Sequence, residues 1–178
     1  MIKNWVKGTA ILFGFWLVLS GHFEGKYILA GLAASMLIAR ICVPLLSIRD
    51  WYDELYCILD LPLMRFIAYW LWLFTEICKA SLAVAKTVIR PHMDIQPQIV
   101  EFYCAYRNPV AITMLINSII LTPGTVTIDV RENSSFFVVH ALTDHAAEGL
   151  LEGTMQRKIG KLFGEDVTID FVSKGVCA

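Results

Sequence analysis

Four ionisable side chains in the C-terminal half of the sequence are of the types that a metal site or an acid–base site would need. They are Asp129, His140, Asp144 and His145. Imidazole nitrogens and carboxylate oxygens bind zinc and similar ions, and both groups transfer protons in catalysis. His140, however, lies in an alternating pattern that indicates a strand, and Asp144 lies where a helix begins. We therefore expect ordinary structural roles, with no metal ligand, no cofactor-binding residue and no catalytic residue.

The sequence also lacks the short motifs of common enzyme classes. It contains no phosphate-binding glycine loop, no nucleophile elbow and no HExxH pair. The five cysteines are widely spaced and form no CxxC pair: Cys42, Cys57, Cys78, Cys104 and Cys177. They are typical of buried apolar residues in a reducing compartment rather than of a disulfide framework or a zinc site. The sequence therefore does not indicate an enzyme.

A second set of charged residues follows one side of the third apolar segment, residues 62–90. With Tyr69, Trp72 and Ala83 between them, its members fall at intervals of three and four: Arg65, Glu76, Lys79, Lys86 and Arg90. Positions at this spacing share one face of a helix, which here lies opposite an apolar face. Such a helix can lie in the membrane interface, or it can span the bilayer with its polar stripe against partner subunits. The five charged residues are thus candidate contacts with lipid headgroups or other subunits.

The first two apolar segments, residues 4–22 and 27–47, predict a hairpin of two transmembrane helices. Each is long enough to cross the hydrocarbon core of about 30 Å. Their interiors contain no Asp, Glu or Lys. Because such residues mark ion and proton paths, these spans are not expected to form a path alone. Gly31 and Ser35 lie four residues apart, where another transmembrane helix could approach closely. Simple alanine-rich helix content explains the same pattern equally well.

Composition supports a membrane location for the first half of the chain. Of the 178 residues, 57% are hydrophobic and 17% are charged, and the mean hydropathy is +0.60. Residues 1–98 carry a net charge of +2 and residues 99–178 a net charge of −3. Neither charge is large enough for a nucleic-acid-binding surface. We expect the lipid bilayer and other proteins as partners, and no nucleic acid.

The distribution of basic residues predicts the orientation of the hairpin. Lys3, Lys7, Arg40 and Arg49 lie on one side of it and Lys26 on the other, which places both ends in the cytoplasm. Two spans would leave the C-terminal region in the cytoplasm, whereas three would place it outside. We favour a third helix that is interfacial or steeply tilted, and a cytoplasmic C-terminal domain.

Residues 91–98 form a proline-flanked linker after the membrane region 1–90, and residues 99–178 have the pattern of a small soluble α/β domain. Asn108 and Pro109 predict the start of a helix. Strands are predicted at 99–106, 125–130, 136–142 and 167–171, and helices at 110–121 and from 143 or 144 to about 163. The order β-α-β-β-α-β is that of the ferredoxin-like split βαβ fold. We therefore expect a membrane protein with a helical hairpin, a third amphipathic or tilted helix, and a ferredoxin-like domain.

This domain is organised around the segment Asn117–Val130, where a helical pattern ends and a strand pattern begins. The four-residue turn Thr122-Pro123-Gly124-Thr125 joins the two patterns. Proline suits the first central position of a type II turn, and glycine supplies the positive φ of the second.

The same segment carries a resemblance to a known family. The motif NSIILTPGTVTIDV, followed by the run from Val139 to Leu142, is similar to the E-type subunits of the multisubunit Mrp-type Na+/H+ antiporters. The resemblance covers nearly the whole chain. Its motif residues are Asn117, Thr122, Pro123, Gly124, Thr125, Asp129 and His140. The run from Val167 to Ala178 extends past where shorter relatives are expected to stop, which leaves open whether it forms a strand.

The resemblance implies a non-catalytic integral-membrane subunit of a monovalent cation/proton antiporter in the plasma membrane. Such a subunit would support assembly and Na+ or K+ exchange for protons, in pH and salt homeostasis. Its partners would be the other subunits of the complex, the larger of which would hold the ion paths. A different class of hypothesis is a membrane-tethered ferredoxin-like domain that binds a small ligand or a metal, for example through His140, and regulates another protein.

Overall fold

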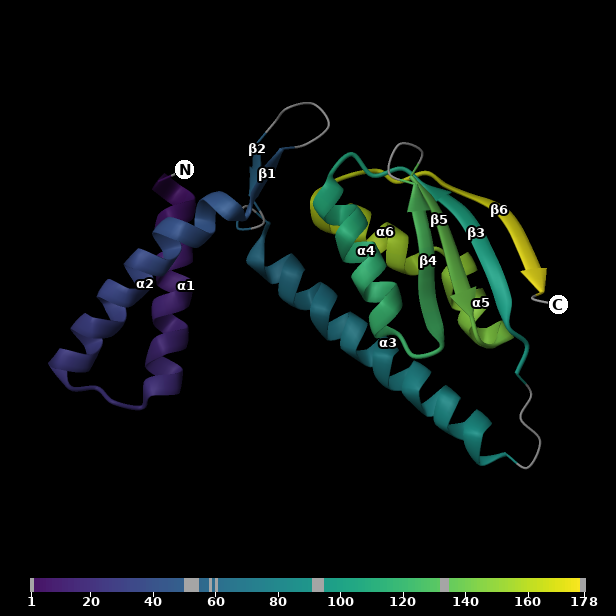
Figure 1. The fold of residues 1–178 in the computed structure, drawn as a ribbon, viewed down its shortest axis with the longest axis horizontal. Helices are drawn as coiled ribbons and strands as arrows, with labels where there is room; N and C mark the ends of the chain where they lie inside the picture. Colours follow the sequence, from purple (N-terminus) through teal and green to yellow (C-terminus); the bar gives the residue numbers. More distant parts are fainter. Residues whose placement is uncertain are drawn as a thin grey trace. The chain divides into compact units, whose positions relative to one another are not determined.

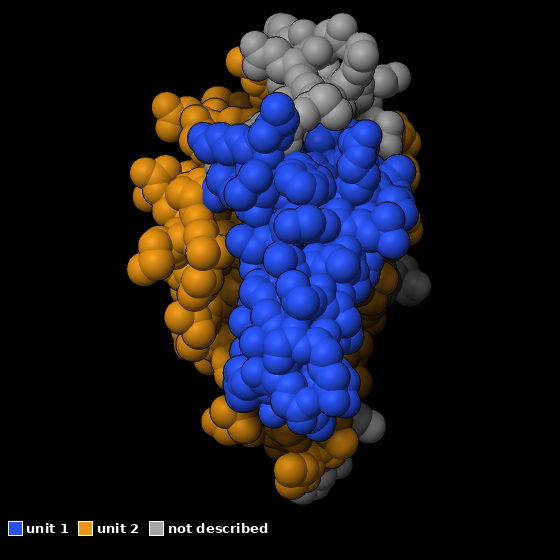
Figure 2. Space-filling model, turned by 90° about the vertical axis from the view of Figure 1, so that its left-hand side faces the viewer, with its two compact units in different colours: residues 1–61 blue, residues 62–178 orange. Residues whose placement is uncertain are grey.

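The computed structural model describes residues 2–49, 55–57, 59, 61–90, 95–131 and 135–176, and Figure 1 labels the helices and strands among them. The chain divides into two compact units, Met1–Leu61 and Pro62–Ala178, which Figure 2 shows in blue and orange. Parts of the region 49–60, between the second and third apolar segments, and of the linker 91–98 lie outside the described residues, as does Cys177.

Two packed helices form most of the first unit. Helix α1 spans Ile2–Ser20 and helix α2 spans Gly25–Leu45, and Gly21 lies between them with a φ of 60°, a backbone conformation that glycine adopts without steric cost. Every fourth residue on one face of α2 is buried: Gly31, Ser35, Ala39 and Val43. A Cβ atom at Gly31 would overlap the indole ring of Trp16 on α1. The helix that approaches Gly31 and Ser35 is therefore α1 of the same chain, and Ser35 is left only 3% exposed.

The membrane-type helices begin and end within about two residues of the predicted segments. Helix α3 spans Leu63–Ile89, and among the described residues α1, α2 and α3 are long and apolar enough to cross a membrane. After α2 the chain forms a short antiparallel pair of strands, β1 (Ser47–Arg49) and β2 (Leu55–Cys57), which were not predicted from the sequence. The ammonium group of Lys7 donates to the carbonyl of Leu59 at 2.9 Å, which ties α1 to the segment after β2.

A small α/β domain and α3 make up the second unit. Its described strands are β3 (Gln98–Cys104), β4 (Thr125–Arg131), β5 (Phe136–Ala141) and β6 (Ile169–Val176), and they form one antiparallel sheet in the order β4-β5-β3-β6. Helices α4 (Pro109–Leu121), α5 (Asp144–Leu151) and α6 (Thr154–Phe163) cover one face of this sheet (Figure 1). The C-terminal strand that the sequence left open is present as β6.

The core of this domain is built from alternate residues of its strands. On β3, Val100, Phe102 and Cys104 are fully buried beneath the helices, whereas Tyr103 on the opposite face is 40% exposed. The rings of Phe102 and Phe137 stack with their centroids 5.2 Å apart. Because successive strand residues point to opposite faces, this single alternation separates the core from the open face of the sheet.

Local capping residues determine where the helices begin. The side chain of Asn108 accepts from the backbone N–H of Val110 at 2.9 Å, with Pro109 as the first residue of α4, and Thr143 caps α5 by accepting from Ala146. Both predicted starts are confirmed. The prediction of one continuous helix from residue 143 or 144 to about residue 163 is wrong, because Gly153 has a φ of 65°. This left-handed conformation ends the first helical segment, and α6 starts after it.

The turn after α4 has the geometry that its sequence predicts. Gly124 has a φ of 89°, and the N–H of Thr125 donates to the carbonyl of Thr122 at 3.3 Å, as in a type II turn. The carbonyl of Gly124 also accepts from the N–H of Leu142 at 2.8 Å. A Cβ on Gly124 would lie 3.5 Å from a methyl group of Val84 on α3. The turn thus joins α4 to the sheet and lies next to α3.

Replacing Gly124 with valine should destabilise the protein by about 1 to 3 kcal/mol, because a β-branched residue is strained at positive φ. The matched control is Gly149→Val in α5, where an added Cβ meets no atom within 4 Å and no positive φ is required. The free energy of unfolding of the detergent-solubilised chain measures both. Equal losses in the two variants would contradict the conformational explanation.

Candidate functional site

Helix α3 has two different faces, and the domain covers one of them. Tyr69 and Leu73 are 5% and 0% exposed because they pack against the domain. On the opposite side, Leu71, Phe74 and Leu82 are each about two-thirds exposed, at 64%, 65% and 64%. Figure 1 shows α3 running along one side of the domain within the second unit. One helix therefore presents an apolar surface outward and packs against the α/β domain on its other side.

A buried hydrogen bond fixes α3 to α4. The hydroxyl oxygens of Tyr69 and Ser118 lie 2.7 Å apart. Since the Ser118 hydroxyl donates to the carbonyl of Met114 at 2.7 Å, the phenol of Tyr69 is the donor to Ser118. Ser118 is 2% exposed, so the two hydroxyl groups satisfy each other away from water. The sequence signal for this contact is a polar residue inside an otherwise apolar helix.

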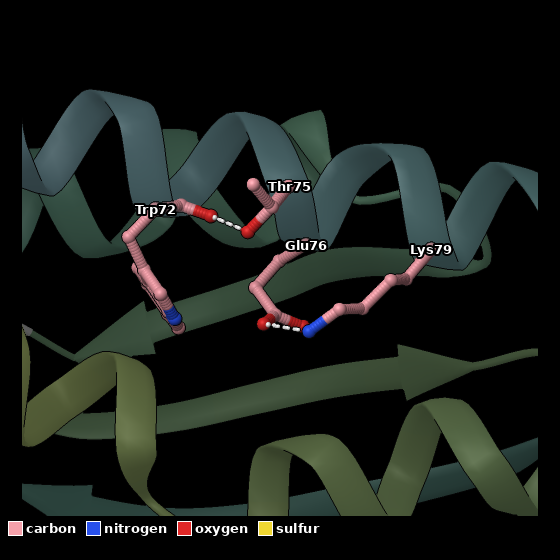
Figure 3. Close-up of polar contacts among 4 residues, drawn as sticks. All are labelled: Trp72, Thr75, Glu76 and Lys79. Atoms are coloured by element: carbon pink, nitrogen blue, oxygen red, sulfur yellow. Dashed lines mark hydrogen bonds and ion pairs between the residues drawn. The ribbon is translucent and has the colours of Figure 1, made fainter.

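The next turns of α3 contribute charged and aromatic groups to the side of the helix that faces the domain. Figure 3 shows Trp72, Glu76 and Lys79 on one side of the helix. The ammonium of Lys79 lies 2.9 Å from a carboxylate oxygen of Glu76, and the ammonium of Lys158 on α6 lies 4.8 Å from the ring centroid of Trp72. A cation above an indole face is attracted by the ring quadrupole. Part of the predicted polar stripe thus faces the domain.

A cavity of about 460 Å³ lies between α3 and α5. Its walls come from α3, from α5 and the start of α6, and from the turn after α4. Small residues line both helical walls: Ala80 and Ala83 on α3, and Ala146 and Gly149 on α5. Charged residues also line it, namely Glu76, Lys79, Glu148 and Glu152, together with His145. We refer to this cavity as the α3–α5 groove.

Comparison with known proteins decides the family. The family model described as Na+/H+ ion antiporter subunit matches residues 9–162. The chain belongs to this family. It is 26% identical over 158 residues to the E1 subunit of the Na(+)/H(+) antiporter of Staphylococcus haemolyticus, an alignment that covers 88% of this chain and 94% of that protein. It is also 26% identical over 153 residues to the E1 subunit of the Staphylococcus aureus antiporter, covering 85% and 91% of the two chains.

Two solved structures are also similar to this antiporter subunit. A chain of the membrane-bound sulfane sulfur reductase, an archaeal respiratory membrane complex, matches with a TM-score of 0.65 and 24% identity, covering 88% of this chain and 96% of that one. This likeness concerns the fold. A chain of the Mrp complex from Dietzia matches with a TM-score of 0.39 and 27% identity, covering 57% of this chain and 94% of that one. The family itself is one of antiporter subunits.

In this antiporter subunit the motif residues build the turn and the strand that follows it. The hydroxyl of Thr122 donates to the carbonyl of Ser118 at 2.9 Å, and that of Thr125 donates to the carbonyl of Ile119 at 2.6 Å. Pro123 lines the groove, whereas Asn117 is exposed on α4. These contacts bind the end of α4 to the start of β4.

The ionisable residues singled out in the sequence are not brought together. Asp129 lies 3.7 Å from Arg131 on β4, and His140 lies on β5 opposite Ile99 and Val126. Asp144 accepts a hydrogen bond from the amide of Gln98, and His145 lines the groove. Within the described ranges no three His, Cys, Asp or Glu side chains are close enough to hold a metal ion.

The remaining charged candidates lie near the ends of α3 or just after it. Arg65, Lys86 and Arg90 are exposed.

Two buried ionisable groups of the domain, Cys104 and Tyr106, stay neutral. Burial raises the pKa of the Cys104 thiol to about 12, and burial, with a further contribution from Cys104, also raises the pKa of Tyr106. The phenol of Tyr106 donates to the backbone carbonyl of Gln156 at 2.8 Å. Neither group supplies a nucleophile or a base near neutral pH.

Replacing Tyr69 with phenylalanine should cost about 1 kcal/mol of stability, because it removes one buried hydrogen bond while Ser118 keeps its bond to Met114. The matched control is Tyr103→Phe, which removes the same hydroxyl from the open face of the sheet. Denaturant unfolding of the detergent-solubilised chain compares the two. An unchanged stability in Tyr69→Phe would show that this bond does not hold α3 on the domain.

Proposed function

We propose that this chain is a non-catalytic integral-membrane subunit of a multisubunit antiporter that exchanges Na+ or K+ for protons across the plasma membrane. Its role is to support assembly of the complex, and through assembly the exchange that maintains pH and salt homeostasis. The observation that carries the proposal is the family match over residues 9–162. The other subunits of the antiporter and the lipid bilayer are its partners.

The membrane helices support a role in assembly rather than in conduction. Residues 8–20 of α1 and 27–39 of α2 contain no Asp, Glu, Lys or Arg, although ion and proton paths through membranes depend on such residues. On α3, Glu76 is paired with Lys79 on the side that faces the domain. The outward face of α3 instead offers apolar contact area, which suits lipid and neighbouring helices.

The two faces of α3 also support an interfacial position for this helix and a cytoplasmic position for the domain. A helix that spans a bilayer is surrounded by lipid or by other membrane segments. One side of α3 instead faces a part of the domain that carries Lys158 on α6, Glu148 on α5 and Glu152 just after α5. Such groups are costly in hydrocarbon. With α1 and α2 as the spans, the basic residues at the ends of the hairpin favour the cytoplasmic side for the domain.

The sheet supports assignment of the domain to the ferredoxin-like class. In the split βαβ arrangement the first and second strands are parallel, and the third lies between them. Here β5 pairs antiparallel with both β3 and β4, and β6 pairs with the other edge of β3. We propose residues 99–178 as this domain and 1–90 as the membrane region. Since α3 packs on the domain, it belongs structurally to both.

The isolated chain should transport nothing, and the complex should require it. Proteoliposomes that contain only this polypeptide, with a pH-sensitive dye inside and a Na+ or K+ pulse outside, should show no cation-dependent proton flux. Native membranes from cells that lack the chain should lose most of their exchange activity, and expression of the chain should restore it. Proton flux through the isolated chain that Glu76→Gln abolishes would overturn the accessory role.

A further inference from the structure

The α3–α5 groove is wide because both of its walls carry small side chains. Ala80 and Ala83 on α3 face Ala146 and Gly149 on α5. The groove's volume of about 460 Å³ lies in the range of about 300 to 1,000 Å³ that is typical of ligand pockets.

Gly149 has no steric reason within the described chain to be glycine. A Cβ at this position would meet no atom within 4 Å, and its φ is not positive. Alanine would stabilise α5 relative to glycine. Glycine is useful where another group must approach the backbone closely, and Gly149 is exposed towards the groove. This points to an occupant from outside the chain.

The charges of the groove define the chemistry of that occupant. Three carboxylates, those of Glu76, Glu148 and Glu152, and one ammonium, that of Lys79, line it. Glu148 and Glu152 are four residues apart, at the end of α5, and like charges at this spacing destabilise a helix. A cation bound between them would remove that repulsion. Two lysines of the chain already contact groove residues in this way. The ammonium of Lys79 lies 2.9 Å from the carboxylate of Glu76, and that of Lys158 lies 4.8 Å from the ring centroid of Trp72.

The position of the groove favours a protein segment over a lipid. It lies on the side of α3 that faces the domain, opposite the exposed apolar face of Leu71, Phe74 and Leu82. Acyl chains would contact that apolar face rather than a groove lined by carboxylates. A polar segment that carries a long basic side chain would fit the groove, because the stem can pack against alanine and the head can reach the carboxylates.

We propose that the α3–α5 groove is the docking site for a cytoplasmic segment of another antiporter subunit, which inserts an arginine or lysine side chain between α3 and the Glu148–Glu152 pair. This inference rests on the proposed function and adds to it the surface and the chemistry of the contact. The groove couples α3 and the domain to the partner in a single contact.

Cysteine protection in the intact complex tests whether the groove is occupied. Gly149→Cys should react with a soluble maleimide in the isolated detergent-solubilised chain and at least tenfold more slowly in the purified complex, as measured by mass spectrometry at that position. Gly175→Cys is the matched control, because a Cβ there also meets no atom within 4 Å, and it should react at similar rates in both. Equal reactivity of Gly149→Cys in both samples, with the other subunits present, would overturn the proposal.

Charge reversal tests the chemistry of the contact. The double variant Glu148→Lys, Glu152→Lys should recover at least tenfold less of the other subunits from native membranes than the wild type, and Glu148→Gln, Glu152→Gln should lie in between. Asp166→Lys, a reversal at an exposed site outside the groove, should leave recovery unchanged. Thermal unfolding of each chain confirms that it folds. Unchanged recovery with the double reversal would overturn the proposal.

Two further outcomes distinguish a docked protein segment from a bound lipid, and failure of the groove proposal from failure of the proposed function. Protection of Gly149→Cys in the isolated chain on transfer from detergent to phospholipid nanodiscs would identify a lipid as the occupant and overturn the docking site. If the wild-type chain recovers no other antiporter subunit, the proposed function itself is overturned, and the groove proposal with it.

Discussion

The packing of α3 against the domain is the interaction on which the rest of the second unit depends. Tyr69 and Leu73 are buried in this contact, and the phenol of Tyr69 donates to Ser118. Because one side of α3 is covered in this way, its apolar residues are left on the opposite side, where Phe74 is 65% exposed. A domain whose supporting helix exposes so much apolar surface requires a membrane surface or another apolar partner to cover it.

The same contact fits the proposed role of a small subunit that supports a transporter through assembly. Helices α1 and α2 meet through small residues such as Gly31 and Ser35, which makes the hairpin self-contained. In the proposed interfacial position, α3 would bring the domain to the membrane surface. The turn at Gly124 lies next to α3, near Val84. Within the second unit, the contact with the domain, the groove and the exposed apolar face thus share one helix. The subunit's contribution to exchange would act through the arrangement of its neighbours.

Local features could be predicted from the sequence, and contacts between distant segments could not. The caps at Asn108 and Thr143 and the positive φ of Gly124 depend on neighbouring residues only, so composition and spacing were sufficient to predict them. The break at Gly153 was missed because an isolated glycine in a helical pattern is often tolerated. The polar stripe on α3 was visible, but the bond of Tyr69 to Ser118 joins residues 49 positions apart, and no local pattern indicates such a partner.

The depth of α3 in the bilayer tests the account most directly. Single nitroxide labels at Ile67, Phe74, Leu82 and Ile89, which are exposed on the outward face, would be measured by power saturation in liposomes that contain the complex. Our account predicts similar shallow depths at all four positions, because the helix lies along the interface. At 1.5 Å per residue, a spanning α3 would instead carry the labels over about 30 Å, from one surface through the bilayer centre to the other. That gradient would contradict an interfacial α3 and, with it, a cytoplasmic domain.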